Sequence, residues 1–436
     1  MSSAAWVQRL SNDDCSSYLR QAIAEGLFER HDWILIHDLN LMEAKYAALD
    51  AAFASESLHA VAVKANPVVG VLRRLVARGA GLECASMEEV EIAARAGCPP
   101  DRIVFDSPAK TRRDLAQALD RGVVLNADNF DELARIAALL EGGDRGALKA
   151  HVGLRINPMV GEGAIAATSV GGRVSKFGVP LEEAQVEILA AFERWTWLTG
   201  VHVHVGSQGC TVEQLLAAAK RIEALLATIE ERRPGQIVDV DIGGGLPVSY
   251  DTATVAPCVT TYADELRRAC PTLMSGRYRI ITEFGRAIHA NCGVAASRVE
   301  YVKTYGGSAM AVVHFGADFL MRPVYNPDDW SHEFVALDPD GRVKTGPAQP
   351  YAMAGPLCFG GDFVGREVML PALTPGDFVC ARDVGAYTLS MWSRHCSRAQ
   401  PLVVGATADG PLEPLRAAET PRGVALDWEQ PREGSS

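Results

Sequence analysis

The chain has 436 residues, of which 48% are hydrophobic and 22% are charged, and its formal net charge is −12. Its length favours two domains, and its composition is typical of a folded globular protein and excludes a disordered one. The negative charge argues against a nucleic acid or an anionic membrane as the partner, because both bind basic surfaces.

The sequence carries no sign of export, membrane insertion or a metal centre. Its first residues, MSSAAWVQRLSNDDC, lack a basic stretch followed by an apolar one, so we expect no signal peptide. No apolar run approaches the ~20 residues that cross a bilayer as a helix. The ten cysteines are scattered without a CxxC pair, which favours reduced thiols and a cytoplasmic location, and we expect no metal.

From about residue 59 to residue 283, short apolar runs alternate with amphipathic stretches. Stretches such as MEEVEIAARAG and TRRDLAQALDRG repeat apolar residues at the i, i+3 and i+4 spacing of a helix. The apolar runs predict eight strands: LHAVAVK, GLECAS, RIVFDS, GVVLNA, KAHVGLRIN, GVHVHVGS, IVDVDIGGG and RYRIITEFG. Eight strands, each followed by a helix, predict an α/β protein with a (βα)8 TIM-like barrel, and a doubly wound open sheet is the alternative.

After about residue 294 the pattern changes to short apolar runs separated by Gly, Pro and Asp turns, such as RVEYVKTY, AMAVVHF, HEFVALD and DFVCAR. This pattern predicts a C-terminal β-rich domain built like a sandwich or a small barrel. We place the barrel at residues 36–290, and we assign residues 1–35 and 291–436 to the β-rich domain.

Polar residues gather where the predicted barrel strands end. In such barrels the functional groups collect at the carboxyl ends of the strands. The strand-end residues here are Lys64, Cys84, Asn157, His204, Ser207, Gly243, Gly244, Gly245, Glu283 and Arg286.

Lys64 closes the apolar run LHAVAVK. An amine near apolar walls loses its proton more readily and can then form a Schiff base, although a lysine at a strand end is more commonly a solvated cap. Gly243 to Gly245 let backbone N–H groups approach a phosphate closely, and a tight turn is the alternative. Arg286 can add a charge-assisted contact to the same phosphate.

His202 and His204 face the same side of one predicted strand. They are either two metal ligands or one ring that stacks on a planar cofactor beside a structural neighbour, and the lack of a third ligand argues against the metal. Glu283 ends its strand at the barrel mouth. A carboxylate that faces a pyridine nitrogen keeps the nitrogen protonated and makes the ring a better electron sink.

The motifs VAVKANP, HVHVGSQ, DIGGG, TEFGR, GPLCFGGD and DVGAYTLS occur in an order and at separations that resemble the fold-type III pyridoxal-phosphate decarboxylases. This family includes the diaminopimelate, ornithine and arginine decarboxylases. The segments WILIHDLNLMEAKYAALDAAF, LMRPVY and SRHCSRAQP are similar to the diaminopimelate branch. The resemblance extends from about Trp33 to Pro401.

The resemblance implies pyridoxal 5′-phosphate as the cofactor and a role for each matching residue. Lys64 is the Schiff-base lysine, and His204 stacks on the cofactor ring. Cys358 is the proton donor and reaches the site from the second subunit of a homodimer, while Arg322 grips the substrate's distal carboxylate. The phosphate and the pyridine nitrogen are bound by Ser207, Gly243, Gly244, Gly245, Glu283, Gly285, Arg286 and Tyr387.

The sequence departs from the family pattern in three places. Phe359 stands where the family has an acidic residue that reads the substrate's far amino group, and a phenyl ring cannot accept a hydrogen bond from an ammonium. Asp362 can replace that acid only if the loop bends differently. His395 and Cys396 replace a Tyr-Asn pair, which also concerns substrate recognition. Phe284 replaces a proline and concerns only the backbone.

The sequence therefore predicts an enzyme that decarboxylates an amino acid with a distal carboxylate, such as meso-diaminopimelate, which would give lysine. The alternatives are a specialised biosynthetic decarboxylase in siderophore or other secondary metabolism, an ornithine- or arginine-type decarboxylase, and an inactive regulatory homologue. A racemase on the same barrel is a further alternative, but the HVHVGS and GPLC segments favour the decarboxylases.

Overall fold

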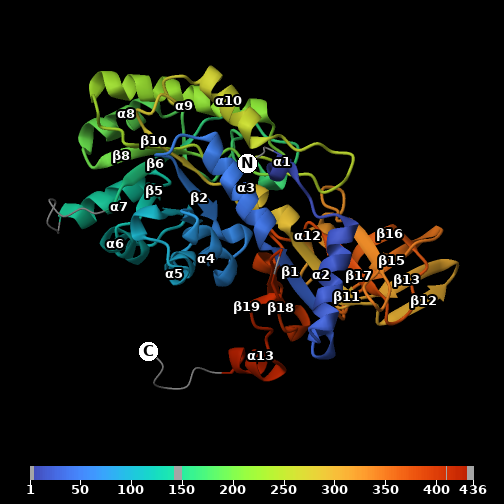
Figure 1. The fold of residues 1–436 in the computed structure, drawn as a ribbon. Helices are drawn as coiled ribbons and strands as arrows, with labels where there is room; N and C mark the ends of the chain where they lie inside the picture. The colour runs from blue at the N-terminus through green and yellow to red at the C-terminus, as the bar shows by residue number, and fades with distance from the viewer. Residues whose placement is uncertain (1–3, 142–149, 409, 430–436) are drawn as a thin grey trace. The chain divides into compact units, whose positions relative to one another are not determined.

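The computed structural model describes residues 4–141, 150–408 and 410–429 (Figure 1). The chain divides into two compact units. The first contains Leu41–Ser249, Thr254–His289 and the described residues up to Gln8, and the second contains Arg9–Asn40, Tyr250–Ala253 and the described residues from Ala290 onward.

The first unit is built on a closed barrel of eight parallel strands. Its strands are β2 (Leu58–Ala62), β3 (Gly81–Cys84), β4 (Ile103–Asp106), β5 (Val124–Ala127), β6 (Val152–Asn157), β8 (Leu198–Val203), β9 (Asp239–Asp241) and β10 (Arg279–Thr282). Each pairs with the next, β5 pairs with β6, and β10 pairs with β2 to close the ring, while the short β7 (Val179–Pro180) adds to β6. The predicted (βα)8 barrel is confirmed, and the open-sheet alternative is wrong.

The barrel strands are buried over almost their whole length, as expected when helices cover a parallel sheet. A cluster of small and branched side chains from four of the strands fills part of the interior: Leu58, Ala60, Val104, Val124 and Ile281. Alternating residues of parallel strands meet in such layers, so the barrel centre is a packed core and not a channel.

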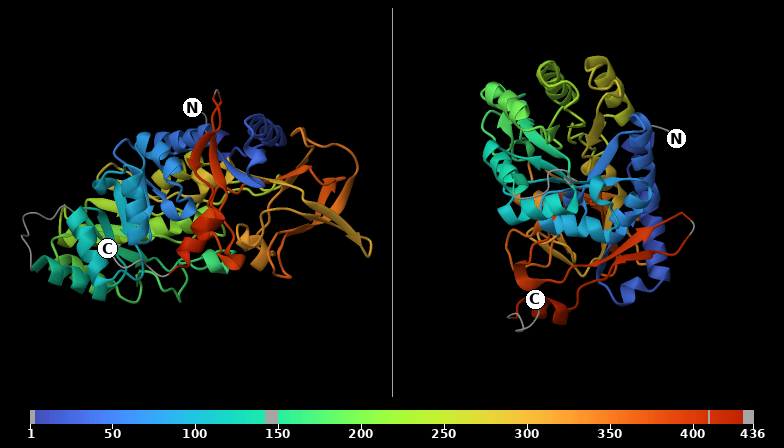
Figure 2. Two further views of the ribbon diagram at one scale, coloured as in Figure 1. Left: turned by 90° about the horizontal axis from the view of Figure 1, so that it is seen from below. Right: turned by 90° about the vertical axis from the view of Figure 1, so that its left-hand side faces the viewer.

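Helices surround the strands of the first unit (Figure 2). They are α1 (Ala4–Val7), α3 (Leu39–Ala52, which begins in the second unit), α4 (Val69–Ala77), α5 (Met87–Arg95), α6 (Arg112–Arg121), α7 (Phe130–Glu141), α8 (Gln185–Arg194), α9 (Val212–Arg232), α10 (Val259–Ala269) and α11 (Arg286–His289). Thr111 and Thr211 begin α6 and α9 with capping boxes, in which the hydroxyl accepts from a backbone N–H one turn later. The predicted helical stretch TRRDLAQALDRG therefore begins at Thr111, the capping residue of α6.

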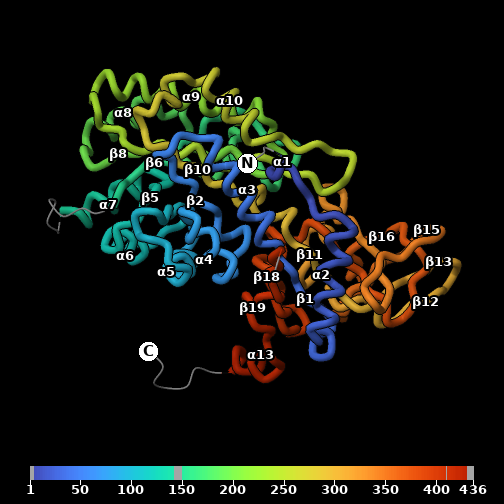
Figure 3. The backbone as a smooth tube through the Cα atoms, in the orientation of Figure 1, coloured from blue at the N-terminus to red at the C-terminus, as the bar shows by residue number. Residues whose placement is uncertain are grey.

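The strands of the second unit form two sheets, and Figure 3 traces the backbone that carries them. The six-stranded sheet has the order β14 (Phe334–Leu337), β17 (Phe378–Arg382), β11 (Gly293–Arg298), β1 (Trp33–Asp38), β18 (Leu402–Ala406) and β19 (Glu413–Arg416). The four-stranded sheet has the order β12 (Tyr301–Tyr305), β13 (Ser308–Val312), β15 (Ala348–Ala354) and β16 (Phe363–Pro371). Its helices are α2 (Asn12–Ala24), α12 (Met321–Tyr325) and α13 (Pro421–Asp427). The predicted β-rich domain is confirmed.

In the described part of the chain, no helix combines the length and the apolar character needed to cross a membrane.

Candidate active site

Lys64 lies in the short turn that follows β2, and its amine forms an ion pair with Glu83 on β3. The two strands pair in parallel with Ala62 opposite Glu83. Lys64, two residues beyond Ala62, therefore lies near the end of β3. The lysine side chain is 40% exposed, whereas the glutamate side chain is fully buried. The amine is therefore accessible from the barrel mouth while its partner stays out of water.

Burial raises the pKa of Glu83 well above its ordinary value, although the charge of Lys64 opposes this shift. The nearby carboxylates of Asp106 and Glu283 raise the pKa further. A carboxyl group with a raised pKa next to an amine can take up the proton that the amine releases. The Lys64–Glu83 pair thus supplies a lysine that can become an uncharged nucleophile.

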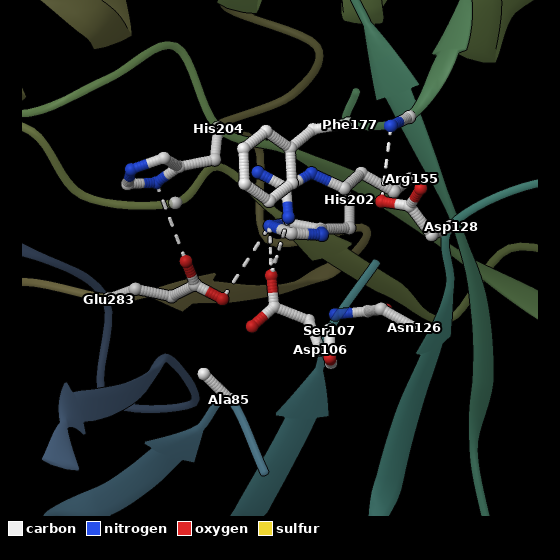
Figure 4. Close-up of polar contacts among 12 residues, drawn as sticks. Ala85, Asp106, Ser107, Asn126, Asp128, Arg155, Phe177, His202, His204 and Glu283 are labelled. Atoms are coloured by element: carbon white, nitrogen blue, oxygen red, sulfur yellow. Dashed lines mark hydrogen bonds and ion pairs between the residues drawn. The ribbon is translucent and has the colours of Figure 1, made fainter. Parts of the chain in front are cut away.

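Glu283 follows β10 and lies between two histidines that come from β8 and the loop after it (Figure 4). Its Oε1 atom is 3.5 Å from His202 Nε2, and its Oε2 atom is 3.5 Å from His204 Nδ1. Burial pushes the pKa of Glu283 upward, but the two histidines, His202 foremost, outweigh burial and hold the pKa well below its ordinary value. The buried carboxylate is therefore charged at neutral pH.

His204 is neutral in the same environment, because burial lowers its pKa more than Glu283 raises it. Its Nδ1 atom accepts a hydrogen bond of 3.2 Å from the backbone N–H of Gly244. This contact fixes the ring against the glycine loop.

A second set of buried polar side chains lies next to Glu283. Asp106 receives a 3.0 Å hydrogen bond from Arg155 and is 3.8 Å from His202 (Figure 4). The Arg155 guanidinium also stacks on the ring of Phe177 at 4.5 Å. Burial and Glu283 push the pKa of Asp106 upward, but Arg155, His202 and Lys64 together lower it below its ordinary value.

One atom from each of Asp106, His202 and Glu283 lies within 4.8 Å of the others, a spacing that a metal ion can accept. The positive charge beside Asp106 is, however, the guanidinium of Arg155. The trio is thus also part of a buried network of ion pairs that includes Arg155.

The glycine run after β9 is pressed against neighbouring backbone. A side chain on Gly244 would place its Cβ atom 2.4 Å from the carbonyl oxygen of Glu283, and one on Gly243 would approach the carbonyl oxygen of Val203 to 2.6 Å. Gly243 also has φ +68°, which only glycine adopts without strain. Glycine is therefore required at these positions.

Ser207 and Arg286 lie together at this end of the barrel, where the arginine Nε atom donates a 3.2 Å hydrogen bond to the serine Oγ. Gly285, just before Arg286, packs so tightly that an added Cβ atom would lie 2.8 Å from the Cβ atoms of Ala62 and Ala65 beside Lys64. A cation, a hydroxyl and the backbone N–H groups of a glycine loop form the kind of donor set that binds a phosphate group. With the reactive lysine and the buried carboxylate, these residues fit pyridoxal phosphate.

Two predicted residues of the second unit, Arg322 and Tyr387, are in contact. Arg322 on α12 lies between two rings, 4.5 Å from the centroid of Trp330 and 4.8 Å from that of Tyr387. Tyr387 has φ +55°, an uncommon conformation for a tyrosine that is found at functional sites.

Three further predicted residues of the second unit are at the surface. Cys358 and His395 are exposed, and Phe359 is 36% exposed. The rings of Phe359 and His395 meet edge to face, with centroids 6.5 Å apart. Among the ten cysteines, only Cys358 and Cys396 are exposed.

Asp362 does not replace the missing acid of this loop. Its side chain is buried and accepts hydrogen bonds from the backbone N–H groups of Ala317 (2.6 Å) and Leu357 (2.7 Å). Its carboxylate also occupies the space beside Gly316 and Gly355, where any added side chain would collide with it. The aspartate therefore holds the loop together from within.

Comparisons with known proteins agree with this barrel and this donor set. Residues 39–290 match the model of the pyridoxal-dependent decarboxylase family, pyridoxal binding domain. The chain is 34% identical to diaminopimelate decarboxylase of Pseudomonas aeruginosa over 82% of this chain and 83% of the relative, and 32% identical to that of Zymomonas mobilis over 83% of both. The crystal structure of diaminopimelate decarboxylase from Helicobacter pylori complexed with L-lysine superimposes with a TM-score of 0.82 at 28% identity, covering 93% of this chain and 99% of that one.

Fold and site together define a pyridoxal-phosphate enzyme of the barrel type. The chain belongs to the pyridoxal-dependent decarboxylase family, and it is an amino-acid decarboxylase that uses pyridoxal phosphate.

Four polar residues of the barrel were not singled out from the sequence: Glu83, Asp106, Arg155 and Asp241. Glu83 and Arg155 lie within β3 and β6, whereas Asp106 and Asp241 end β4 and β9, and all four are buried. Burial raises the pKa of Asp241 well above its ordinary value, and Glu283 adds to the shift. A charge within an apolar run is the signal that points to Glu83 and Arg155, because such a charge needs a partner. Position at a strand end is the signal that points to Asp106 and Asp241.

Proposed function

We propose that this enzyme decarboxylates an amino acid that carries a second carboxylate at its far end, of the diaminopimelate kind. The observation that carries the proposal is the Lys64–Glu83 pair beside a charged, buried Glu283, together with Arg322 held between two aromatic rings. The first set suits the reacting end of the substrate and the second suits a distal carboxylate. Relatives that are diaminopimelate decarboxylases support this choice.

In this proposal the cofactor is held by residues of this chain with distinct tasks. Lys64 bonds to it covalently, and Glu83 accepts the proton that the lysine amine gives up. The glycine run, Ser207 and Arg286 bind the phosphate, and neutral His204 covers the ring. Tyr387 is a further phosphate-binding residue that the family resemblance implies. When bound, the cofactor supplies an electron sink for the charge that the departing carboxylate leaves behind. Glu283 keeps the pyridine nitrogen protonated, because its own carboxylate stays charged.

Cys358 has the role of proton donor in this proposal. Its exposed thiol can deliver a proton from Sγ to the substrate carbon after carbon dioxide has left. We propose further that the enzyme is a homodimer in which this cysteine serves the site of the second subunit, as the family resemblance implies. A cytoplasmic location is proposed as well, and cysteines without disulfides support it, since none of the ten forms one in the described residues.

The test is carbon dioxide release by the purified holoenzyme from a panel of amino acids: meso-diaminopimelate, its N-acylated forms, ornithine, arginine and lysine. Substrates with a distal carboxylate are expected to react, and ornithine and arginine to react poorly, because the charge of Arg322 repels a distal cation. Release from ornithine alone would overturn the assignment of Arg322. A holoenzyme that releases no carbon dioxide from any of them would favour the inactive homologue.

A further inference from the structure

Three aromatic side chains of the second unit form one exposed cluster, which we name the distal aromatic cluster: Tyr325, Phe359 and His395. The ring of Phe359 is in the middle. It stacks on Tyr325 with centroids 5.8 Å apart and an interplanar angle of 23°, and it meets His395 at 6.5 Å and 89°. The three residues come from the end of α12, the loop after β15 and a short turn before β18, so the chain fold and not sequence proximity assembles them.

The position of the central ring is fixed by its own loop. Phe359 lies over Gly361, where an added Cβ atom would be 2.6 Å from the phenyl Cζ atom. The backbone of Asp362 donates a 3.0 Å hydrogen bond to the carbonyl oxygen of Phe359, and its buried side chain anchors the loop. The ring is therefore a built feature of the loop and not a side chain that swings freely in solvent.

The cluster is nevertheless open at the surface. Tyr325 is 62% exposed and Phe359 is 36% exposed. Contiguous exposed aromatic surface commonly marks a binding site. Two neighbours connect it to the substrate under the proposed function, on which this inference rests: Arg322 precedes Tyr325 by three residues on α12, and Cys358 directly precedes Phe359.

The charges around the cluster decide which distal group it accepts. Asp362 points inward, so this loop offers no carboxylate to an ammonium. Arg322 is one helical turn from Tyr325 and disfavours a second cation nearby. A flat, uncharged group can instead stack on the faces of Tyr325 and Phe359 while a carboxylate pairs with Arg322.

We infer that the distal aromatic cluster selects substrates whose far nitrogen is acylated, so that a planar secondary amide replaces the free ammonium. The substrate class is thus a 2-amino acid with a distal carboxylate and a distal amide. Phe359 and Tyr325 determine specificity by contact with the amide, and they do not take part in the bond-breaking step.

The experiment compares kcat/KM for meso-diaminopimelate and for its distally N-acetylated form in the holoenzyme. We expect the acetylated compound to be preferred by the wild type by at least about tenfold. Phe359→Glu should shift the ratio toward the free amine by about ten- to a hundredfold, since it restores a charged acceptor. Phe359→Leu and Tyr325→Leu should reduce the preference mainly through KM. Tyr305→Leu, which removes a 79% exposed ring from β12, is the matched control and should leave the ratio unchanged.

The outcomes separate this inference from the proposed function. Suppose that both compounds release carbon dioxide, but the free amine is preferred or Phe359→Leu leaves the ratio of the two kcat/KM values unchanged. The inference is then overturned and the decarboxylase assignment stands. If Phe359→Leu changes the oligomeric state and not the ratio, the cluster is a subunit contact and the inference is again overturned. If neither compound reacts while another amino acid does, the substrate assignment and the inference fall together.

Discussion

Lys64 donates through Nζ to both carboxylate oxygens of Glu83, a glutamate whose side chain has no contact with solvent. Among lysines of the described chain this pairing is distinctive in joining an accessible amine to a fully buried acid. It gives the amine a fixed direction and a nearby acceptor for its proton. The pairing makes Lys64 the expected attachment point of the cofactor.

The first prediction concerns that attachment. Borohydride reduction of the holoenzyme should fix the cofactor to Lys64, and peptide mass mapping will identify the modified residue. Lys64→Ala should lose the covalent bond and about 10³-fold or more in carbon dioxide release. The exposed helical residue Lys220 supplies the control, because Lys220→Ala should behave like the wild type. Labelling of a different lysine would refute the assignment.

The second prediction concerns the charge of Glu283. Glu283→Gln keeps the size of the side chain but removes the negative charge that the histidines stabilise. Because a preorganised charge of this kind is worth about 10²–10³ in kcat, we expect a loss of that order with the cofactor still bound. Cofactor absorbance and single-turnover rates check the two parts separately. Glu283→Asp retains the charge and should fall between the wild type and the glutamine variant.

A third prediction separates two exposed thiols. Cys358→Ala should lower turnover by about 10²–10⁴-fold, the usual contribution of a positioned proton donor, while cofactor binding stays unchanged. Cys396→Ala removes the other exposed cysteine, at a position that concerns substrate recognition, so it should change KM and leave kcat near that of the wild type. Unchanged activity of Cys358→Ala would show that another group reprotonates the product, and His395 would be tested next.

A fourth prediction follows from two histidines that are buried in their neutral form. Burial lowers the pKa of His37 and of His59 from 6.5 to about 4. Below pH 6.5 the unfolded chain binds a proton at each site that the folded chain refuses, so stability is complete above this pH and falls toward pH 4. The slope is about 1.4 kcal/mol per pH unit for each histidine.

Denaturant titrations at several pH values measure this slope. His59→Gln can keep a hydrogen bond to Thr282 Oγ1, which lies 2.8 Å from His59 Nδ1 in the wild type. The variant should reduce the loss of stability of the first unit between pH 6.5 and pH 4. The exposed His395→Gln should not. If the slope of stability against pH below 6.5 is the same in His59→Gln as in the wild type, the low pKa of His59 is wrong.

The sequence predicts those parts of the site that depend on position along a strand. The eight strands follow from apolar runs, and Lys64, His204 and Glu283 could be identified because functional groups collect where barrel strands end. Asp106 ends β4 and Arg155 lies within β6, but the sequence does not show that they pair, because the contact joins two strands that are not adjacent in sequence. Pairing of charges across a barrel depends on register and closure, which periodicity does not determine.

The loop after Cys358 is a second place where contacts cannot be predicted from the sequence. The sequence identifies Phe359 as an unusual residue but leaves open whether Asp362 can replace the family's acid. Only the fold shows that Asp362 bonds to Ala317 and Leu357 from within. A contact between Tyr325 and Phe359 cannot be predicted from the sequence either, because a ring contact between a helix end and a distant loop depends on three-dimensional placement.

The place of β1 in the six-stranded sheet has a consequence for synthesis on the ribosome. This strand leaves the ribosome early, yet it lies between β11, which pairs with it antiparallel, and β18, which pairs with it in parallel from near the other end of the chain. The apolar residues of β1 therefore have no sheet neighbour while the whole barrel is translated. Unpaired apolar strands are prone to aggregate. We expect the nascent chain to depend on chaperones until translation has passed β18, and chains that stop before Leu402 to leave one edge of β1 uncovered.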